Sequence, residues 1–364
     1  MPTTMASASA TATASRSSFP TPRPYAYPHV TTFVGSGAGG SADGAGTSAL
    51  LNKPYSVALG VAGSGVYLYV ADTFNHKIRA VTAAGVVTTL VGGGAGGATP
   101  GSTQGVGTAC LFYLPFGVAV TAGNILVADT FNYRVRVVSP DGLSITTLAG
   151  GGVTGVVQGW ADGIGTNALF NRPQQFAIGP TGVVYVSDSY NHRVCAIALD
   201  GTVSTLAGGG ASKHQSGAND GVGSAALFYF PYGLDVSASG DTVFVCDALN
   251  SRVRAINVSD GTVSTIAGGG GAANGGTLSG ISDGVGTAAL FNQPAGVAGG
   301  ADGILFVSDS GGYTIRAISP DGTVNRLAGG GTSHTGGFAD GTGSNALLPG
   351  TSTSLTTPLR APCS

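Results

Sequence analysis

The chain has 364 residues, of which 64 are glycine; 42% are hydrophobic, only 9% are charged, and the formal net charge is −2. All 17 acidic residues are aspartate, and because Asp favours turns whereas Glu favours helices, this composition predicts strands joined by tight turns. The apolar content argues against a disordered chain, the count of 15 Lys and Arg argues against a nucleic-acid-binding face, and no apolar run is long enough to predict a membrane span.

Residues 1–28 differ in composition from the rest of the chain. They are rich in Ser, Thr, Ala and Pro, carry Arg16 and Arg23, and contain no acidic residue. The apolar stretch of a secretory signal is missing from them. An organelle transit peptide and a disordered tail both fit this segment, so the sequence does not identify the compartment.

From residue 30 onward the sequence repeats with a period of 57 to 62 residues. One segment reads VADTFNHKIR at 70–79 and returns as VADTFNYRVR, VSDSYNHRVC, VCDALNSRVR and VSDSGGYTIR, with its aspartate at positions 72, 129, 188, 247 and 309. A second segment, DGAGTSALLNKP from Asp43, recurs in step, and an apolar stretch followed by glycines closes each copy. Similarity at a regular spacing is the signature of a repeat architecture.

Each copy contains four short strands. In the second copy we expect them at 116–121, 124–129, 133–138 and 144–149, where β-branched residues alternate between turn signals such as Asp-Gly. A sheet of this size has two apolar faces and is stable only when neighbouring copies cover them. The pattern therefore predicts an all-β protein, a β-propeller of four-stranded antiparallel blades.

The ends of the repeat set the expected number of blades. The chain opens with a lone fourth strand at 30–34, continues through five complete copies and starts a further unit at Asp340. We therefore expect a six-bladed ring with an incomplete last blade, in which the N-terminal strand pairs with the C-terminal unit and hides two sheet edges; a five-bladed ring is the alternative. The propeller would span 29–348, and 349–364 is either a degenerate C-terminal tail or part of the closing blade.

The two recurring segments resemble NHL repeats, in particular the glycine-rich form found in bacterial, plant and algal proteins. The resemblance covers residues 30–348 and departs at three positions: Gln104 replaces the Asp of the second segment, Gly312 replaces a turn Asn, and Cys195 replaces a strand Arg. It implies a propeller that binds macromolecules, but a fold alone does not say which ones.

The turns between the second and third strands carry the candidate binding residues. In a propeller these turns share one face with the loops that lead into the blades, so polar and aromatic side chains would form a ring there. The candidates are Asp72, Phe74, Asn75, Asp129, Phe131, Asn132, Asp188, Tyr190, Asn191, Asp247 and Asn250. The alternative for the Asp and Asn side chains is structural, because they can bond to the amides of their own turns and pair with the strand arginines inside the blade.

Motifs for catalysis or cofactor binding do not stand out. GSGAGG at 35–40 matches a dinucleotide-binding pattern, but no amphipathic helix follows it, and the Walker A and HExxH patterns are absent. The four cysteines have no paired spacing, which argues against a disulfide framework and a zinc site. We therefore expect no catalytic residue, no metal ligand and no cofactor.

These observations predict a non-catalytic binding scaffold for a protein or glycan partner. Two alternatives stay open. The Asp and Asn ring suggests a metal-dependent propeller hydrolase or lyase, and the resemblance extends to relatives that bind RNA, although the low number of Lys and Arg makes a nucleic-acid partner the less favoured one.

Overall fold

The computed structural model describes residues 28–60, 63–271, 276–300, 302–331 and 335–348. Within these ranges the chain forms strands and one-turn 3-10 segments, and no α-helix. The predictions for residues 1–28 and 349–364 concern segments that lie outside the described residues, except for Pro28.

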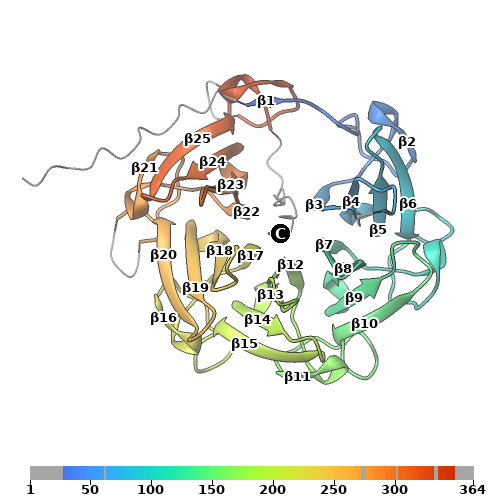
Figure 1. Ribbon diagram of the computed structural model, residues 1–364, viewed down its shortest axis with the longest axis horizontal. Helices are drawn as coiled ribbons and strands as arrows, with labels where there is room; N and C mark the ends of the chain where they lie inside the picture. Colours follow the sequence, from blue (N-terminus) through green and yellow to red (C-terminus); the bar gives the residue numbers. More distant parts are fainter. Residues whose placement is uncertain (1–27, 61–62, 272–275, 301, 332–334, 349–364) are drawn as a thin grey trace, which may run out of the picture.

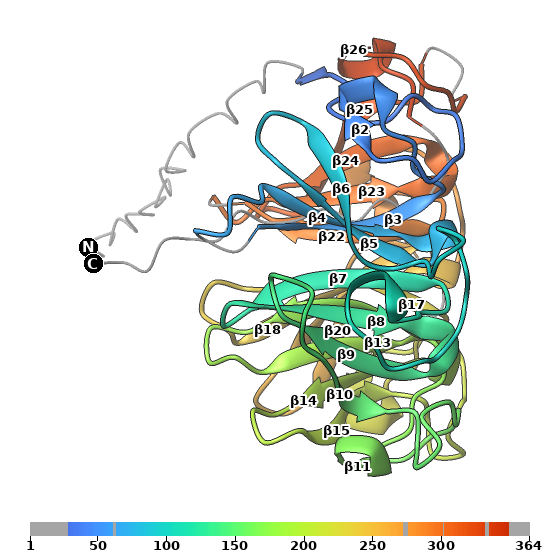
Figure 2. The same ribbon diagram turned by 90° about the vertical axis from the view of Figure 1, so that its right-hand side faces the viewer.

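The strands form five antiparallel blades around a central axis (Figure 1). In chain order the blades are β3 (Pro54–Leu59), β4 (Leu68–Asp72), β5 (Lys77–Val81) and β6 (Val86–Gly92); β7 (Pro115–Thr121), β8 (Asn124–Asp129), β9 (Arg134–Val138) and β10 (Ile145–Gly150); β12 (Pro173–Ile178), β13 (Val184–Asp188), β14 (Arg193–Ile197) and β15 (Thr202–Gly208); β17 (Pro231–Val236), β18 (Thr242–Asp247), β19 (Arg252–Asn257) and β20 (Thr262–Gly268); and β22 (Pro294–Gly299), β23 (Leu305–Asp309), β24 (Thr314–Ile318) and β25 (Thr323–Gly329). The first strand of each blade lies next to the axis and the fourth on the outside. Seen edge-on, the strands run from one face of the ring to the other (Figure 2).

The structure has five blades. The expectation of six blades is therefore wrong, and the alternative of five blades is correct. The innermost strands pack on one another in the order β3, β7, β12, β17 and β22. After the fifth blade the described chain supplies only a two-residue pair, in which β1 (His29–Val30) meets β26 (Gly341–Thr342). The reason lies in the repeat, because the segment that forms the second and third strands of a blade occurs five times in the sequence.

Four of the blades carry a short fifth strand that sequence reasoning missed. It comes from the DGxG segment and pairs with the outer strand of its own blade. These strands are β2 (Gly44–Ala45), β11 (Gly163–Ile164), β16 (Gly221–Val222) and β21 (Gly284–Val285). The second blade, where Gln104 replaces the Asp of this segment, has four strands.

The strands of the second copy begin and end within one residue of the predicted positions. The Asp-Gly turns also adopt the expected geometry, with a φ of +71° at Gly142 and +83° at Gly201. A positive φ suits glycine because it has no Cβ. Local turn chemistry and strand alternation therefore predict the blade correctly.

Neighbouring blades interlock through a buried phenylalanine. Phe112, Phe170, Phe228 and Phe291 are fully buried. Each lies against the glycine that ends the outer strand of the preceding blade; a Cβ added to Gly208 would lie 2.7 Å from the ring of Phe228. A larger residue there would separate the two blades, which explains why glycine closes every copy.

A buried ion pair joins the second and third strands of each blade. In the fourth blade Arg254 Nη1 lies 2.7 Å from Asp247 Oδ2, and Nη2 lies 2.6 Å from Asp220 Oδ1. Asp220 in turn accepts hydrogen bonds from the backbone amide and the hydroxyl of Thr265 on the outer strand. The arginine therefore connects the inner strands to the DGxG segment outside β20.

Two departures from the repeat preserve this network with other residues. Where the second blade has Gln104, Arg136 Nη2 donates to its Oε1 at 3.1 Å. Where the third blade has Cys195 in place of Arg, Arg193 pairs with both Asp188 and Asp162. The network is thus maintained although the positions that supply it vary.

The fifth blade lacks one partner of its buried carboxylate. In the other blades an Asn side chain donates to the Asp, as Asn250 Nδ2 does to Asp247 at 2.8 Å. Gly312 occupies that position in the fifth blade, and Arg316 lies 3.4 Å from Asp309. With fewer donors to offset its desolvation, burial raises the pKa of Asp309 from 3.8 to about 7.

Removing the arginine of the fourth blade should destabilise the fold strongly. Arg254→Met leaves Asp247 buried without its cation, and breaking a buried pair in this way costs about 3–5 kcal/mol of unfolding free energy. Urea unfolding followed by circular dichroism measures the loss. Lys213→Met, which changes an exposed lysine, serves as the control and should alter stability by less than about 0.5 kcal/mol. A loss of similar size in both variants would contradict the role given to the pair.

The raised pKa of Asp309 predicts a pH-dependent stability. The protonated carboxyl stabilises the fold; this contribution is complete below pH 3.8 and is lost as the pH rises to about 7. Between about pH 5 and pH 8 the unfolding free energy of the wild type should therefore fall by roughly 2–3 kcal/mol more than that of Asp309→Asn. Urea unfolding at a series of pH values tests this, with Asp321→Asn, which removes an exposed carboxylate, as the control. Parallel curves for the wild type and Asp309→Asn would exclude the titration.

Candidate functional site

One face of the ring carries the turns that link the second to the third strand of each blade, and we call it the turn face. These turns are the 3-10 segments η2 (Thr73–Asn75), η4 (Thr130–Asn132), η6 (Ser189–Asn191), η8 (Ala248–Asn250) and η10 (Ser310–Gly312). Each innermost strand begins on the same face, because its first residue pairs with the aspartate before the turn, as Pro54 does with Asp72. The opposite face, which carries the hairpins within the blades, is the hairpin face.

The Asp and Asn candidates lie inside the blades. The eight side chains are each 3% exposed or less: Asp72, Asn75, Asp129, Asn132, Asp188, Asn191, Asp247 and Asn250. In the first blade Asp72 accepts the amide of Asn52 at 2.7 Å and hydrogen bonds from Asn75 and Arg79. Asn75 also donates to the carbonyl of Gly40. Their polar atoms hold the turns and ion pairs together, so the expected ring of oxygens is not at the surface.

The three aromatic candidates reach the surface of the turn face. Phe74 is 37% exposed, and Phe131 and Tyr190 are half-buried. Lys53 Nζ lies 4.7 Å from the centre of the Phe74 ring. Arg172 Cζ lies 4.4 Å from the ring centre of Phe131 and 4.1 Å from that of Tyr190. Arg172 is therefore held between the turns of the second and third blades.

Two more aromatic side chains extend this cluster along the face. Tyr113 lies 5.2 Å from Phe131, and Phe230 lies 4.6 Å from Tyr190, measured between ring centroids. We refer to Tyr113, Phe131, Arg172, Tyr190 and Phe230 as the aromatic row. Aromatic pairs at these distances attract one another beyond the effect of area burial, so the row forms a continuous strip across three blades.

Sequence reasoning missed Tyr113, Arg172 and Phe230. All three lie one or two residues before the proline that begins an innermost strand, in the sequences FYLP, NRP and FYFP. The proline and the two positions before it recur in every copy, so the sequence does mark this place. The side chains at the two positions vary between copies, however, and do not form a motif.

The residue directly before this proline has a left-handed backbone in every blade. The φ values are +47° at Lys53, +47° at Leu114, +56° at Arg172, +53° at Phe230 and +55° at Gln293. Non-glycine residues seldom adopt this conformation, and a following proline disfavours the helical alternative. Backbone strain of this kind costs on the order of 1–3 kcal/mol and clusters at functional sites. The strained position repeats while its side chain changes from blade to blade.

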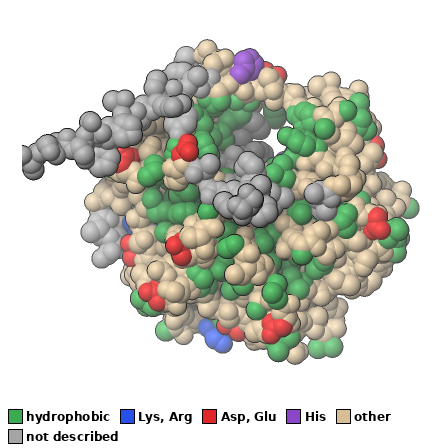
Figure 3. All heavy atoms as spheres, viewed as in Figure 1, with side chains coloured by type: hydrophobic (Ala, Val, Ile, Leu, Met, Phe, Trp, Pro, Cys, Tyr) green, Lys and Arg blue, Asp and Glu red, His purple; other side chains and the backbone are tan. Residues whose placement is uncertain are grey.

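The two faces differ in charge. Six exposed aspartates lie on the hairpin face: Asp141, Asp200, Asp241, Asp260, Asp302 and Asp321. Figure 3, which looks onto this face, shows Asp side chains spread around the ring and hydrophobic side chains gathered toward its centre. On the turn face the aspartates are buried, and Lys53 and Arg172 supply positive charge. The turn face is therefore the more attractive one for an anionic group.

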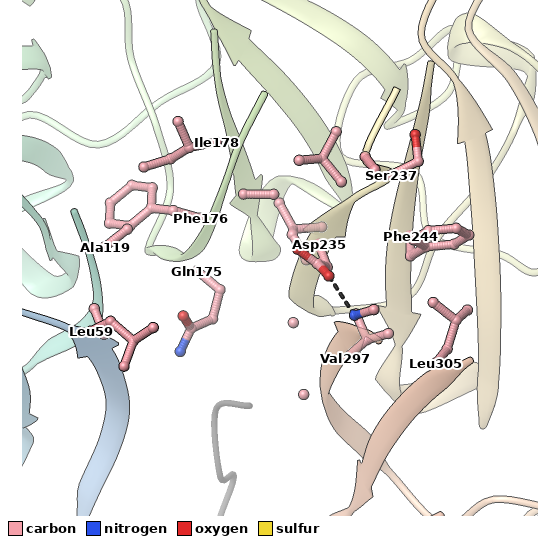
Figure 4. A pocket seen from close by; sticks show the side chains of 18 of the residues that line it. Leu59, Ala119, Gln175, Phe176, Ile178, Asp235, Ser237, Phe244, Val297 and Leu305 are labelled. Carbon is pink, nitrogen blue, oxygen red and sulfur yellow. Dashed lines mark hydrogen bonds between the residues drawn. The ribbon is translucent and has the colours of Figure 1, made fainter. Parts of the chain in front are cut away.

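The central channel holds a cavity of about 520 Å³. Its walls are mostly aliphatic and aromatic, from residues such as Leu59, Phe176 and Val297, and the side chain of Gln175 extends into it (Figure 4). Asp235 lines the same cavity and accepts the amide of Gly299 at 2.5 Å. Acid–base catalysis by paired carboxylates needs two titratable groups that face one another, and the described lining has this single carboxylate.

Other chemical sites are not assembled by the described residues. They contain no group of three or more His, Cys, Asp or Glu side chains placed to hold a metal ion. Cys110, Cys195 and Cys246 are buried free thiols. Within the same part of the chain, no helix has the length and apolar character needed to cross a membrane.

Comparison with known sequences identifies related proteins. The family model described as NHL repeat matches residues 170–197. NHL repeat-containing protein 2 of Bos taurus is 28% identical over 276 residues, which is 70% of this chain and 37% of that protein. Protein SUPPRESSOR OF QUENCHING 1, chloroplastic, of Arabidopsis thaliana is 30% identical over 296 residues, which is 78% of this chain and 26% of that protein. The chain thus spans well under half the length of these curated relatives.

Solved structures share the fold. A protein of unknown function from Bacteroides thetaiotaomicron superposes with a TM-score of 0.63 at 20% identity, over 90% of this chain and 70% of that one. An auxiliary nutrient binding protein from Bacteroides ovatus gives a TM-score of 0.61 at 15% identity, over 90% and 70% of the two chains. At these identities the similarity shows the fold alone. The repeat, the family model, the relatives and the blades agree, and the chain belongs to the NHL repeat β-propellers.

Proposed function

We propose that this propeller is a non-catalytic scaffold that binds a partner through its turn face, with a protein favoured over a glycan. The observation that carries the proposal is the aromatic row, a strip of aromatic side chains around Arg172 on the surface. Tyr, Phe and Arg are enriched at protein interfaces, and Tyr and Arg are common among the residues that dominate binding energy.

The row stands on a rigid support. Phe131 and Tyr190 belong to 3-10 turns whose Asp and Asn side chains are buried and hold the turns through hydrogen bonds and ion pairs. Side chains held in place before binding lose little conformational entropy when a partner docks. The support therefore favours tight recognition by few residues.

The same features weigh against the two alternatives. The Asp and Asn oxygens that suggested a metal-dependent hydrolase or lyase are committed to the blade itself. RNA binding draws on many cations that contact phosphates, whereas the exposed or half-buried lysines and arginines near the turn face are few and spread out, such as Lys53, Arg172 and, in the loop after β15, Lys213. Neither alternative has a specific observation in its favour.

Removing the three aromatic candidates should strongly weaken partner capture. In the triple variant Phe74→Ala, Phe131→Ala and Tyr190→Ala, recovery of the specific partner should fall at least tenfold, because truncating an interface hot spot costs about 2 kcal/mol or more. Affinity capture with quantitative mass spectrometry, comparing the wild type with the variant, measures the recovery.

The matched control changes exposed apolar residues on the other face. Leu143 and Leu199 are 63% and 80% exposed and lie in hairpin turns, so the double variant Leu143→Ala and Leu199→Ala should capture partners as the wild type does. Thermal unfolding of each variant verifies that the blades are intact. If the triple variant retains every protein that the control retains, the turn face is not the binding surface.

A further inference from the structure

Arg172 differs from the arginines of the buried network. Those arginines are buried and pair with aspartates. Arg172 is only half-buried, and within the described residues its guanidinium has neither a carboxylate partner nor a hydrogen-bond acceptor; its close contacts are the rings of Phe131 and Tyr190. A guanidinium carries five N–H donors, and here they are available to a ligand.

The surroundings fix this arginine in place. Its backbone has a φ of +56° and precedes Pro173, which removes the freedom of a loop residue. The centres of two rings from different blades lie within 4.4 Å of its Cζ atom, and a guanidinium is attracted to the faces of such rings. An arginine that has no carboxylate partner in the described part of the chain is thus held at one place on the turn face.

The chemistry of Arg172 indicates the kind of ligand that it can bind. The planar fork of a guanidinium matches the two oxygens of a carboxylate, and charge-assisted pairs of this kind are roughly twice as strong as neutral hydrogen bonds. The Asp side chains that end the second strands on the turn face are buried in their own ion pairs, and six exposed aspartates lie on the hairpin face. The partly exposed aspartates of the DGxG segments, such as Asp43 and Asp162, are paired with the arginines of their own blades. An approaching anionic group is therefore attracted to the turn face and repelled from the hairpin face.

We infer that Arg172, held between Phe131 and Tyr190, binds a carboxylate of an acidic peptide segment in the protein partner, with the aromatic row packing on the apolar part of that segment. The inference rests on the proposed function and specifies the partner's chemistry. An acidic peptide is favoured over a nucleic acid because one fixed arginine can engage a carboxylate, whereas a run of phosphates requires a row of cations.

A peptide binding assay tests the inference. The probes are fluorescein-labelled hexaglutamate and hexaglutamine with blocked ends, together with a labelled hexauridylate, titrated with the purified chain at low salt and read by fluorescence anisotropy. The wild type should bind hexaglutamate at least tenfold more tightly than hexaglutamine, and added salt should weaken the binding. Arg172→Gln should weaken hexaglutamate binding roughly tenfold or more, as expected for loss of a hydrogen bond to a charged group.

Two further variants distinguish the effect of the guanidinium shape from the effect of positive charge. Arg172→Lys keeps the charge but not the fork, so it should bind hexaglutamate with intermediate affinity. Lys213→Gln removes an exposed lysine outside the aromatic row and should bind as the wild type does. Thermal unfolding verifies that each variant is folded.

Three outcomes overturn the inference. They are equal binding of hexaglutamate and hexaglutamine, unchanged hexaglutamate binding by Arg172→Gln, and tighter binding of hexauridylate than of hexaglutamate that depends on Arg172. The proposed function is decided separately: if partner capture depends on Phe74, Phe131 and Tyr190 while Arg172→Gln captures as the wild type does, the turn face binds a partner but Arg172 is not its carboxylate receptor.

Discussion

The buried pair between the arginine of the third strand and the aspartate that ends the second strand is the constraint on which each blade depends. It neutralises a carboxylate that also holds the 3-10 turn, and in four blades the same arginine reaches the Asp of the DGxG segment. Because one side chain connects the inner strands, the turn and the outer segment, these parts are fixed together. The surface of the turn face is therefore formed by residues outside this network, such as Phe131, Arg172 and Tyr190.

Much of this fold could be predicted from the sequence. The repeat of the VADT and DGxG segments predicts antiparallel blades, and the strand limits agree with the structure because alternation and Asp-Gly turns are local signals. The blade count could not be read in the same way. A lone strand and a partial unit at the ends of the repeat suggest a sixth blade, but a blade needs its second and third strands, and the segment that forms them occurs five times.

The candidate site was predicted only in part. Phe74, Phe131 and Tyr190 follow a conspicuous Asp in each copy, and they lie at the surface. Asp72 and its counterparts share that pattern, but they have the structural role that was the alternative for them, with their side chains buried inside the blade. The sequence alone could not decide between the two roles, because spacing does not show the direction in which a turn points its side chains. Arg172 could not be recognised at all, since the two rings that hold it are contributed by different blades.

The residue before each innermost proline has a left-handed backbone that is constant between blades and a side chain that is not. Its backbone shape is imposed by the turn and is the same at Lys53, Leu114, Arg172, Phe230 and Gln293, although their side chains have little in common. Substitutions among non-glycine residues there leave the architecture untouched and change only what the ring presents to its surroundings. If the turn face binds a partner as proposed, substitutions at these positions would change its specificity one blade at a time without altering the fold.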